Sequence, residues 1–348
     1  MLVIICTGCG SKKAAPSSAR DVEEQEASRS KTRVAQPVAL NPRSQEAAAA
    51  TKSRGDAVIS SSGLIYRGAT AGLIIGEIKD DKFFERSTTY LPGAASDIAV
   101  RDGVAFVACG PAGVFVIDVS ATTPKILAVV DTPGGAYRLH QSGSLLAIAD
   151  GTAGVVVVDI TNPTKPAPVA SWTSNSYVRH VLVDDDTVFA AEDRSGVAVL
   201  RLGAGNSLEL LARLKTDGRA RALHLEGTTL YVADGPGGLL VADVSNPERP
   251  RAIGKHALPD MARDVVAIKG YAFVANGDNG LVVLDVSDPI APSPVSTFVT
   301  EMPVNRVQTS DTHLLIGNDS AGLLVVDVAH PEAPTQVFPL VDSDKNKT

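Results

Sequence analysis

The sequence predicts an all-β fold: a single seven-bladed β-propeller whose four-stranded antiparallel blades each span 41–42 residues. The first observation is a set of seven glycines at intervals of 41 or 42 residues, namely Gly72, Gly113, Gly154, Gly196, Gly238, Gly280 and Gly322. The second is that each glycine opens an apolar run that stops at a polar residue. The third is that Gly, Asn, Asp and Pro separate further short apolar segments in each repeat. Such units bury their faces only against one another, so we expect one closed body.

The fifth repeat shows how the strands are predicted. Strands are expected at 222–225, 230–233, 239–244 and 252–256, because residues that favour tight turns lie between them. The third segment is apolar at nearly every position, which is typical of a strand covered on both faces. We therefore expect the third strand of each blade to pack between neighbouring blades.

The repeats assign residues 56–342 to the propeller and leave flanking segments on both sides. Residues 10–55 are rich in Ser, Ala, Lys, Glu, Gln and Arg and show no sustained apolar period, so we expect a disordered tether. Within it, the stretch 34–39 could add an outer strand to the propeller. Residues 343–348 are expected to form a disordered tail.

The first nine residues form a short apolar stretch that ends at a cysteine and resembles the end of a bacterial lipoprotein signal. The resemblance implies that Cys9 is lipidated and that a lipid anchor holds the protein at the cell envelope, at the outer membrane or cell surface rather than in the cytoplasm. The stretch is shorter than a signal core and no basic residue precedes it, so we expect the true start to lie upstream. The alternative is a cytosolic protein with an apolar beginning.

The composition argues against several classes of function. A net charge of −7 and a pI near 5.4 argue against general nucleic-acid binding, which needs a basic face. Aromatic residues make up only 4% of the chain, so a surface that stacks bases or sugars is not expected. Cys109 is the one cysteine outside the signal, so it has no partner for an internal disulfide and is expected to be a buried core residue.

An aspartate closes the apolar third strand in five repeats, at Asp118, Asp159, Asp243, Asp285 and Asp327. We expect these carboxylates to accept backbone N–H groups in the turn that follows, rather than to bind a metal or act in catalysis. Repeats one and four depart from the pattern, with Glu77 and Arg201 at that place.

Three of these segments resemble the core of LVIVD repeats: LVVLDVSDP at 281–289, LLVADVSNP at 239–247 and VVVVDITNP at 155–163. The resemblance covers about 56–342 and is specific in five of the seven repeats. It implies a propeller fold and a location at the cell envelope. LVIVD repeats have no agreed catalytic residues, so the resemblance implies neither a catalytic site nor a cofactor.

A recurring arginine lies 16 or 17 residues before the repeat glycine in repeats three to seven, at Arg138, Arg179, Arg221, Arg263 and Arg306. At the start of the innermost strands, these side chains would ring one mouth of the central channel. Five guanidinium groups there would attract anions despite the acidic whole. The expected ligand is a carboxylate, a phosphate or the acidic tip of a partner peptide.

The alternative is that each arginine is paired inside its own blade. Four residues before each repeat glycine lie, in the same repeats, Asp150, Glu192, Asp234, Asn276 and Asn318. An antiparallel hairpin would place them beside the arginines. Repeat two lacks both members and has Asp97 and Cys109, while repeat one carries the reversed pair Asp56 and Arg67.

The partners in repeats six and seven are neutral, although Asp278 and Asp319 lie nearby. We therefore expect Arg263 and Arg306 to be the least paired of the five arginines.

No metal site is expected. His140, His180 and His224 are predicted on neighbouring inner strands but at different registers, so their side chains should point to different faces. The acidic segments 184–186 and 276–280 lack the spacing of a twelve-residue calcium loop. No linear motif of a hydrolase, phosphate-binding loop or redox site is present.

These observations favour a monomeric, non-catalytic binding or scaffold module that engages a protein or peptide through the arginine-bearing face. Two alternatives remain open. One is a lyase or hydrolase that uses side chains in the central funnel, and the other is a sensor of a small anion that uses the same arginines.

Overall fold

The computed structural model describes residues 34–35, 58–61, 63–79, 82–203, 205, 207–310, 313–318 and 322–339. The predicted signal with Cys9, most of the predicted tether and the C-terminal tail lie outside these residues. Asp56 and Asp319 lie outside them as well.

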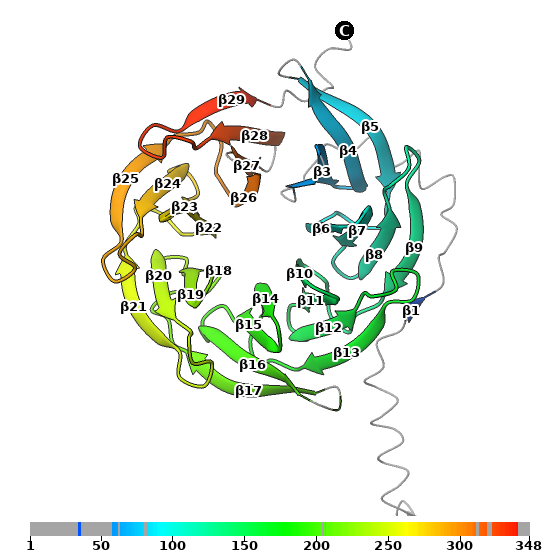
Figure 1. The fold of residues 1–348 in the computed structure, drawn as a ribbon, viewed down its shortest axis with the longest axis horizontal. Helices are drawn as coiled ribbons and strands as arrows, with labels where there is room; N and C mark the ends of the chain where they lie inside the picture. The colour runs from blue at the N-terminus through cyan, green and yellow to red at the C-terminus, as the bar shows by residue number, and fades with distance from the viewer. Residues whose placement is uncertain are drawn as a thin grey trace, which may run out of the picture.

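Seven antiparallel sheets form blades around a central axis, and the described residues contain no helix (Figure 1). Blade one holds β2 (Val58–Ser61), β3 (Leu64–Ala69), β4 (Gly72–Lys79) and β5 (Lys82–Tyr90). Blade two holds β6 (Asp97–Arg101), β7 (Val104–Ala108), β8 (Val114–Asp118) and β9 (Lys125–Val130). Blade three holds β10 (Arg138–Ser142), β11 (Leu145–Ala149), β12 (Val155–Asp159) and β13 (Ala167–Trp172).

The remaining blades repeat this order. Blade four holds β14 (His180–Asp184), β15 (Thr187–Ala191), β16 (Val197–Gly203) and β17 (Ser207–Leu214). Blade five holds β18 (Ala222–Glu226), β19 (Thr229–Ala233), β20 (Leu239–Asp243) and β21 (Arg251–His256). Blade six holds β22 (Asp264–Ile268), β23 (Tyr271–Ala275), β24 (Leu281–Asp285) and β25 (Ser293–Phe298). Blade seven holds β26 (Arg306–Ser310), β27 (His313–Asn318), β28 (Gly322–Asp327) and β29 (Thr335–Pro339). The predicted seven-bladed propeller is confirmed.

One further strand lies outside the repeats. The segment β1 (Val34–Ala35) pairs antiparallel with β9, so blade two has five strands. This pairing confirms an outer strand at the start of the stretch 34–39.

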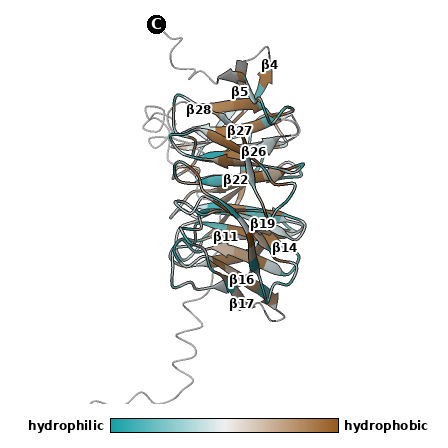
Figure 2. Cartoon of the chain, turned by 90° about the vertical axis from the view of Figure 1, so that its left-hand side faces the viewer, coloured by the Kyte–Doolittle hydropathy of each residue, from teal (hydrophilic) through white to brown (hydrophobic). Residues whose placement is uncertain are grey.

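The hydrophobic core lies between the blades, where apolar strands are enclosed by polar turns on both faces of the ring (Figure 2). Val155 and Val157 of β12, for example, are fully buried among side chains of blade four. Burying a side chain of this size stabilises the fold by about 1.5–3 kcal/mol. Blade seven packs on blade one through a cluster that includes Leu315, Leu323 and Ile65. Side-chain packing therefore closes the ring, since the four repeat strands of blade one and of blade seven are each consecutive in the chain.

The repeat glycines are required by geometry. Gly238 has φ +78°, and a Cβ added there would lie 2.2 Å from the carbonyl oxygen of His256 on the outer strand of the same blade. At Gly154 the same Cβ would lie 2.0 Å from the carbonyl oxygen of Trp172. No other residue fits such a position without moving the outer strand, which explains the 41–42-residue period in the sequence.

The aspartates that close the third strands act in turns, as predicted. Ser287 donates from its backbone nitrogen to Asp285 Oδ1 at 2.9 Å and from its hydroxyl at 2.6 Å. Hydrogen bonds from Ser245, together with one from the Arg251 guanidinium, lower the pKa of Asp243 to about 2. These carboxylates are occupied by their own turns, so they are structural.

Neighbouring blades are also joined by backbone hydrogen bonds near the mouth. In blades two to six, the second residue after the end of the second strand forms an antiparallel bridge to the segment that enters the next blade, at Gly110, Gly151, Asp193, Gly235 and Gly277. All five have positive φ, between 48° and 61°. In blade four this residue is Asp193 instead of glycine, and its side chain contacts arginines at the mouth of the channel.

Candidate functional site

The five predicted arginines occupy two structural positions instead of one. Arg138 and Arg306 are the first residues of β10 and β26, whereas Arg179, Arg221 and Arg263 each lie one residue before an inner strand. Alternate residues of a strand point to opposite sides, so a shift of one residue separates the two sets. The expectation of a single ring of arginines is therefore wrong. The sequence does contain a sign of the two positions: the arginine lies 16 residues before the repeat glycine in the first set and 17 residues before it in the second.

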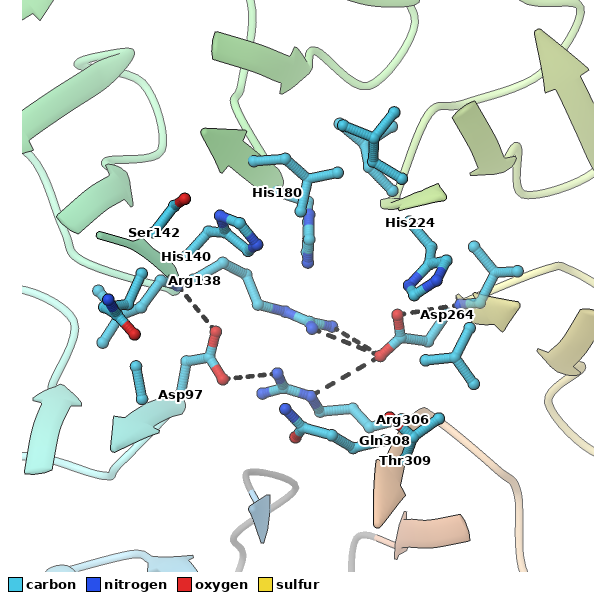
Figure 3. A pocket seen from close by; sticks show the side chains of 18 of the residues that line it. Asp97, Arg138, His140, Ser142, His180, His224, Asp264, Arg306, Gln308 and Thr309 are labelled. Atoms are coloured by element: carbon cyan, nitrogen blue, oxygen red, sulfur yellow. Dashed lines mark hydrogen bonds and ion pairs between the residues drawn. The ribbon is translucent and has the colours of Figure 1, made fainter. Parts of the chain in front are cut away.

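Arg138 and Arg306 form an ionic cluster with two aspartates in the central channel (Figure 3). Arg306 Nη2 lies 2.7 Å from Asp97 Oδ1, and its Nε lies 3.9 Å from Asp264 Oδ2. Arg138 donates to Asp264 Oδ2 across the channel from Nη1 at 3.4 Å and from Nη2 at 3.5 Å. Arg306, expected to be among the least paired arginines, is thus tightly held. Asp97 and Asp264 occupy the same strand position as Arg138 and Arg306, and sequence reasoning missed Asp264.

The residues predicted to pair with the arginines have other partners. Asp150 accepts hydrogen bonds from the Thr132 hydroxyl at 2.6 Å and from the Gly134 backbone nitrogen at 2.8 Å. Glu192 binds Ser174 and Arg213, and Asp234 accepts from the Gly218 nitrogen at 2.7 Å. The predicted pairs Arg138–Asp150, Arg179–Glu192 and Arg221–Asp234 are therefore wrong. Both side chains are buried beneath the turns that they bind, and this burial raises the pKa of Asp150 and of Asp234.

The three arginines that precede the strands lie at one mouth of the channel, where Arg219 joins them. Arg179 Nη2 lies 2.7 Å from Asp193 Oδ2, and Arg219 Nε lies 3.7 Å from Asp193 Oδ1. The Arg179 guanidinium also lies over the Tyr177 ring, 5.2 Å from its centroid. We call Arg179, Arg219, Arg221 and Arg263 the arginine mouth.

Two members of the arginine mouth have weak or neutral partners. Arg221 donates to the Met261 sulfur at 4.0 Å, and Arg263 donates to the Asn305 side chain. Within the described part of the chain, neither has a carboxylate at salt-bridge distance. Burial, followed by the charges of Arg179 and Arg263, lowers the pKa of Arg221, so the positive charge of this mouth is only partly compensated.

A cavity of about 340 Å³ adjoins the arginine mouth. It is lined by Arg179, Tyr137 and Tyr177 together with Ala94, Ala95 and Ser96, and Arg138 and Arg306 also border it. The two tyrosine rings lie 5.8 Å apart. The mouth therefore joins cationic donors to a small aromatic hollow.

Comparison with a protein-family model identifies the repeats. LVIVD repeats match at residues 92–132, 133–173, 217–256 and 259–300, which correspond to blades two, three, five and six. The chain is a seven-bladed propeller that contains four LVIVD repeats. Blade four, which carries Arg201 and its own turn, is not among the four matched repeats, and neither are blades one and seven.

Solved structures show the same fold at low sequence identity. A computationally designed protein, Ika8, is 13% identical with a TM-score of 0.65, over 82% of this chain and 86% of that one. The WD40 repeats of RRP9 are 10% identical with a TM-score of 0.65, over 82% of this chain and 90% of that one. A functionally unknown protein from Desulfotomaculum acetoxidans DSM 771 is 12% identical with a TM-score of 0.65, over 78% of this chain and 96% of that one. A search of curated proteins found no match to the sequence.

The LVIVD propeller brings three histidines into its channel. His140 lies two residues into its inner strand and His180 at the first position of the next, so both point to the same side, as does His224 (Figure 3). The expectation that they face different sides is therefore wrong. Among the described residues, no group of three or more His, Cys, Asp or Glu side chains has an arrangement that could hold a metal ion.

The same residues contain no helix that is long and apolar enough to cross a bilayer.

Cys109 is buried, as predicted, and burial raises the pKa of its thiol to about 12. A thiol with so high a pKa is almost entirely protonated at neutral pH, so it is a poor nucleophile.

The channel histidines predict a pH dependence of stability. Burial lowers the pKa of His140, His180 and His224, so the unfolded chain binds more protons below pH about 6.5. The free energy of unfolding should fall between about pH 7 and pH 5.5, by up to about 1.4 kcal/mol per histidine for each pH unit. Urea unfolding at several pH values checks this, and His140→Gln with His224→Gln should flatten the profile. A wild-type profile that is flat in this range would contradict the burial of neutral imidazoles.

Proposed function

We propose that this LVIVD-repeat propeller is a non-catalytic binding module that engages an acidic segment of a protein or peptide partner at its arginine mouth. The observation that carries the proposal is the imbalance of charge there: of four guanidinium groups, two lie within 4 Å of a carboxylate of the described residues, that of Asp193, and the other two do not. A carboxylate-bearing partner would complete this balance.

The geometry of the guanidinium groups supports a carboxylate ligand. The Nε atoms of Arg179, Arg221 and Arg263 are buried and have no hydrogen-bond partner among the described residues. A buried donor without an acceptor lowers stability, and a guanidinium binds a carboxylate best through two parallel N–H groups. Side chains of glutamate or aspartate would supply those acceptors.

A binding role also fits the surroundings of Asp193. This carboxylate is held between Arg179 and Arg219, so it is not free to take a proton from a substrate. The hollow beside Tyr137 and Tyr177 offers room for a neighbouring side chain of the partner. We propose that the protein acts at the cell envelope, anchored through Cys9, on the basis of the first nine residues of the sequence. We propose a monomer because the blades of one chain complete the ring.

The test is the affinity for a fluorescent acidic peptide of ten glutamates, measured by fluorescence anisotropy at low and moderate salt. In the variant Arg221→Ala/Arg263→Ala, Kd should rise by about tenfold to a hundredfold, because each substitution removes a charge-assisted hydrogen bond. Asp193→Gly should tighten binding severalfold, since it removes the negative charge from the mouth and glycine suits the positive φ of 48°.

The control is Arg249→Ala, which removes one arginine charge from an exposed outer turn. It should leave Kd within about twofold of wild type, because exposed charges far from a site are screened. A peptide that does not bind the wild type, or that responds equally to both arginine variants, would overturn the proposal.

A further inference from the structure

The central channel contains a second cavity, of about 410 Å³, beyond the ionic cluster. The inner strands of blades two to seven line it, and it is distinct from the hollow at the arginine mouth, although Arg138 and Arg306 border both. Three histidine side chains and Gln308 also line it (Figure 3). Its volume falls within the range of sites that hold small molecules, about 300–1,000 Å³.

The hydrogen-bond acceptors of the ionic cluster are already used. Asp97 Oδ1 accepts from the Ile98 nitrogen at 2.9 Å as well as from Arg306, and Oδ2 accepts from the Leu139 nitrogen at 2.8 Å. Asp264 Oδ1 accepts from the Val265 nitrogen at 3.0 Å, and its Oδ2 accepts from Arg138. These carboxylates have little capacity left to bind the donors of a ligand.

Donors, in contrast, remain unsatisfied. Arg138 reaches a single oxygen of Asp264 through two long bonds, at 3.4 and 3.5 Å, so its two terminal nitrogens are only weakly satisfied. The Val183 backbone nitrogen donates to His140 Nδ1 at 3.1 Å, so the neutral imidazole carries its proton on Nε2 and offers a donor. His180 is 9% exposed, points into the cavity in Figure 3, and its buried Nδ1 has no partner in the described part of the chain.

We infer that this cavity is a binding site for a small organic carboxylate, held by Arg138, His140 and His180. An anion rich in acceptors matches a cavity in which the carboxylates of Asp97 and Asp264 are occupied, while donors on the histidines and Arg138 are not fully used. Leu182 and Val266 contribute apolar wall, which suits a short hydrocarbon body better than bare phosphate. The inference goes beyond the proposed function and uses different residues.

The test is isothermal titration calorimetry of the full chain with succinate, its neutral analogue succinamide, and inorganic phosphate. Succinate should bind saturably with one site per chain, and succinamide should bind at least about tenfold more weakly, because it lacks the charge-assisted hydrogen bonds. His140→Leu should weaken succinate by about tenfold, since it removes one donor. Arg221→Ala/Arg263→Ala, which tests the mouth, should leave succinate affinity within about twofold.

Histidine NMR of the wild type provides a measurement that does not depend on a variant that folds. Succinate should shift the imidazole resonances of His140 and His180 in a saturable manner. The inference would be overturned if succinate produced neither heat nor resonance shifts. It would also be overturned if phosphate bound more tightly than succinate, or if the Arg221→Ala/Arg263→Ala variant lost succinate binding. Failure of the acidic peptide to bind the mouth would leave it standing.

Discussion

Replacing Asp264 with alanine is expected to lower the free energy of unfolding by about 3–5 kcal/mol. The side chain of Arg138 is only 16% exposed, and Asp264 is the carboxylate to which it donates from the opposite side of the channel. Removal of Asp264 leaves a guanidinium in a poorly hydrated site without its counter-charge. Burial already lowers the pKa of Arg138, which indicates how unfavourable an uncompensated charge is there.

Urea unfolding followed by circular dichroism measures this loss, and two comparisons sharpen it. Asp217→Ala removes an exposed carboxylate that lies 3.5 Å from Lys255, and it should change stability by no more than about 1 kcal/mol. Adding Arg138→Met to Asp264→Ala should recover part of the loss, because it removes the unpaired charge. If Asp264→Ala unfolds like Asp217→Ala, the ionic cluster does not stabilise the channel.

The second large effect is expected for Gly238→Ala, which should lower the free energy of unfolding by about 2–5 kcal/mol. The new Cβ would lie 2.2 Å from the carbonyl oxygen of His256 and 3.0 Å from the Cα of Ala257, and the φ of +78° is itself unfavourable for alanine. These contacts are with backbone atoms, so relief requires a shift of strand β21 and of the turn after it.

Gly227→Ala is the matched control. Its φ of +57° is also positive, but no atom outside its neighbours lies within 4 Å of the added Cβ. Only the conformational term applies there, so the expected loss is about 1 kcal/mol. Equal losses at the two positions, measured by urea unfolding, would show that the contact with the outer strand does not constrain the repeat.

The fold was predictable because every blade repeats the same local requirements. Gly238 must be glycine because an added Cβ would clash with the outer strand of its own blade. Asp285 accepts hydrogen bonds from a serine two residues further along the chain. Both are local effects, so they leave a periodic trace in the sequence. Blade four shows the limit of such a trace, since Arg201 replaces the turn aspartate while the four strands still form.

The site was predictable only in part, because its pairings are not local. Arg138 binds Asp264, which lies 126 residues away and comes within reach only when the ring closes. The sequence pattern located the arginines but suggested partners within the hairpin. It also joined Arg138 with Arg179, although a one-residue difference in spacing places one in the channel and the other at the mouth.

The histidines illustrate the same limit. His140 and His180 differ by two residues in strand register, which keeps both on the channel side. The start of each inner strand could not be fixed to a single residue from composition alone, so this parity was not visible in the sequence. Which side chains point into the channel therefore depends on the residue at which each inner strand begins, and the sequence did not fix that residue.

The most direct measurement of the central claim is photo-cross-linking of a ten-glutamate peptide that carries a benzophenone at one end, followed by mass spectrometry of the wild-type chain. Peptide bound at the arginine mouth should cross-link to residues around it, such as Tyr137, Tyr177 and Met261, and excess unlabelled peptide should compete. Cross-links that map mainly to the outer strands, or that persist undiminished in Arg221→Ala/Arg263→Ala, would contradict binding at the mouth.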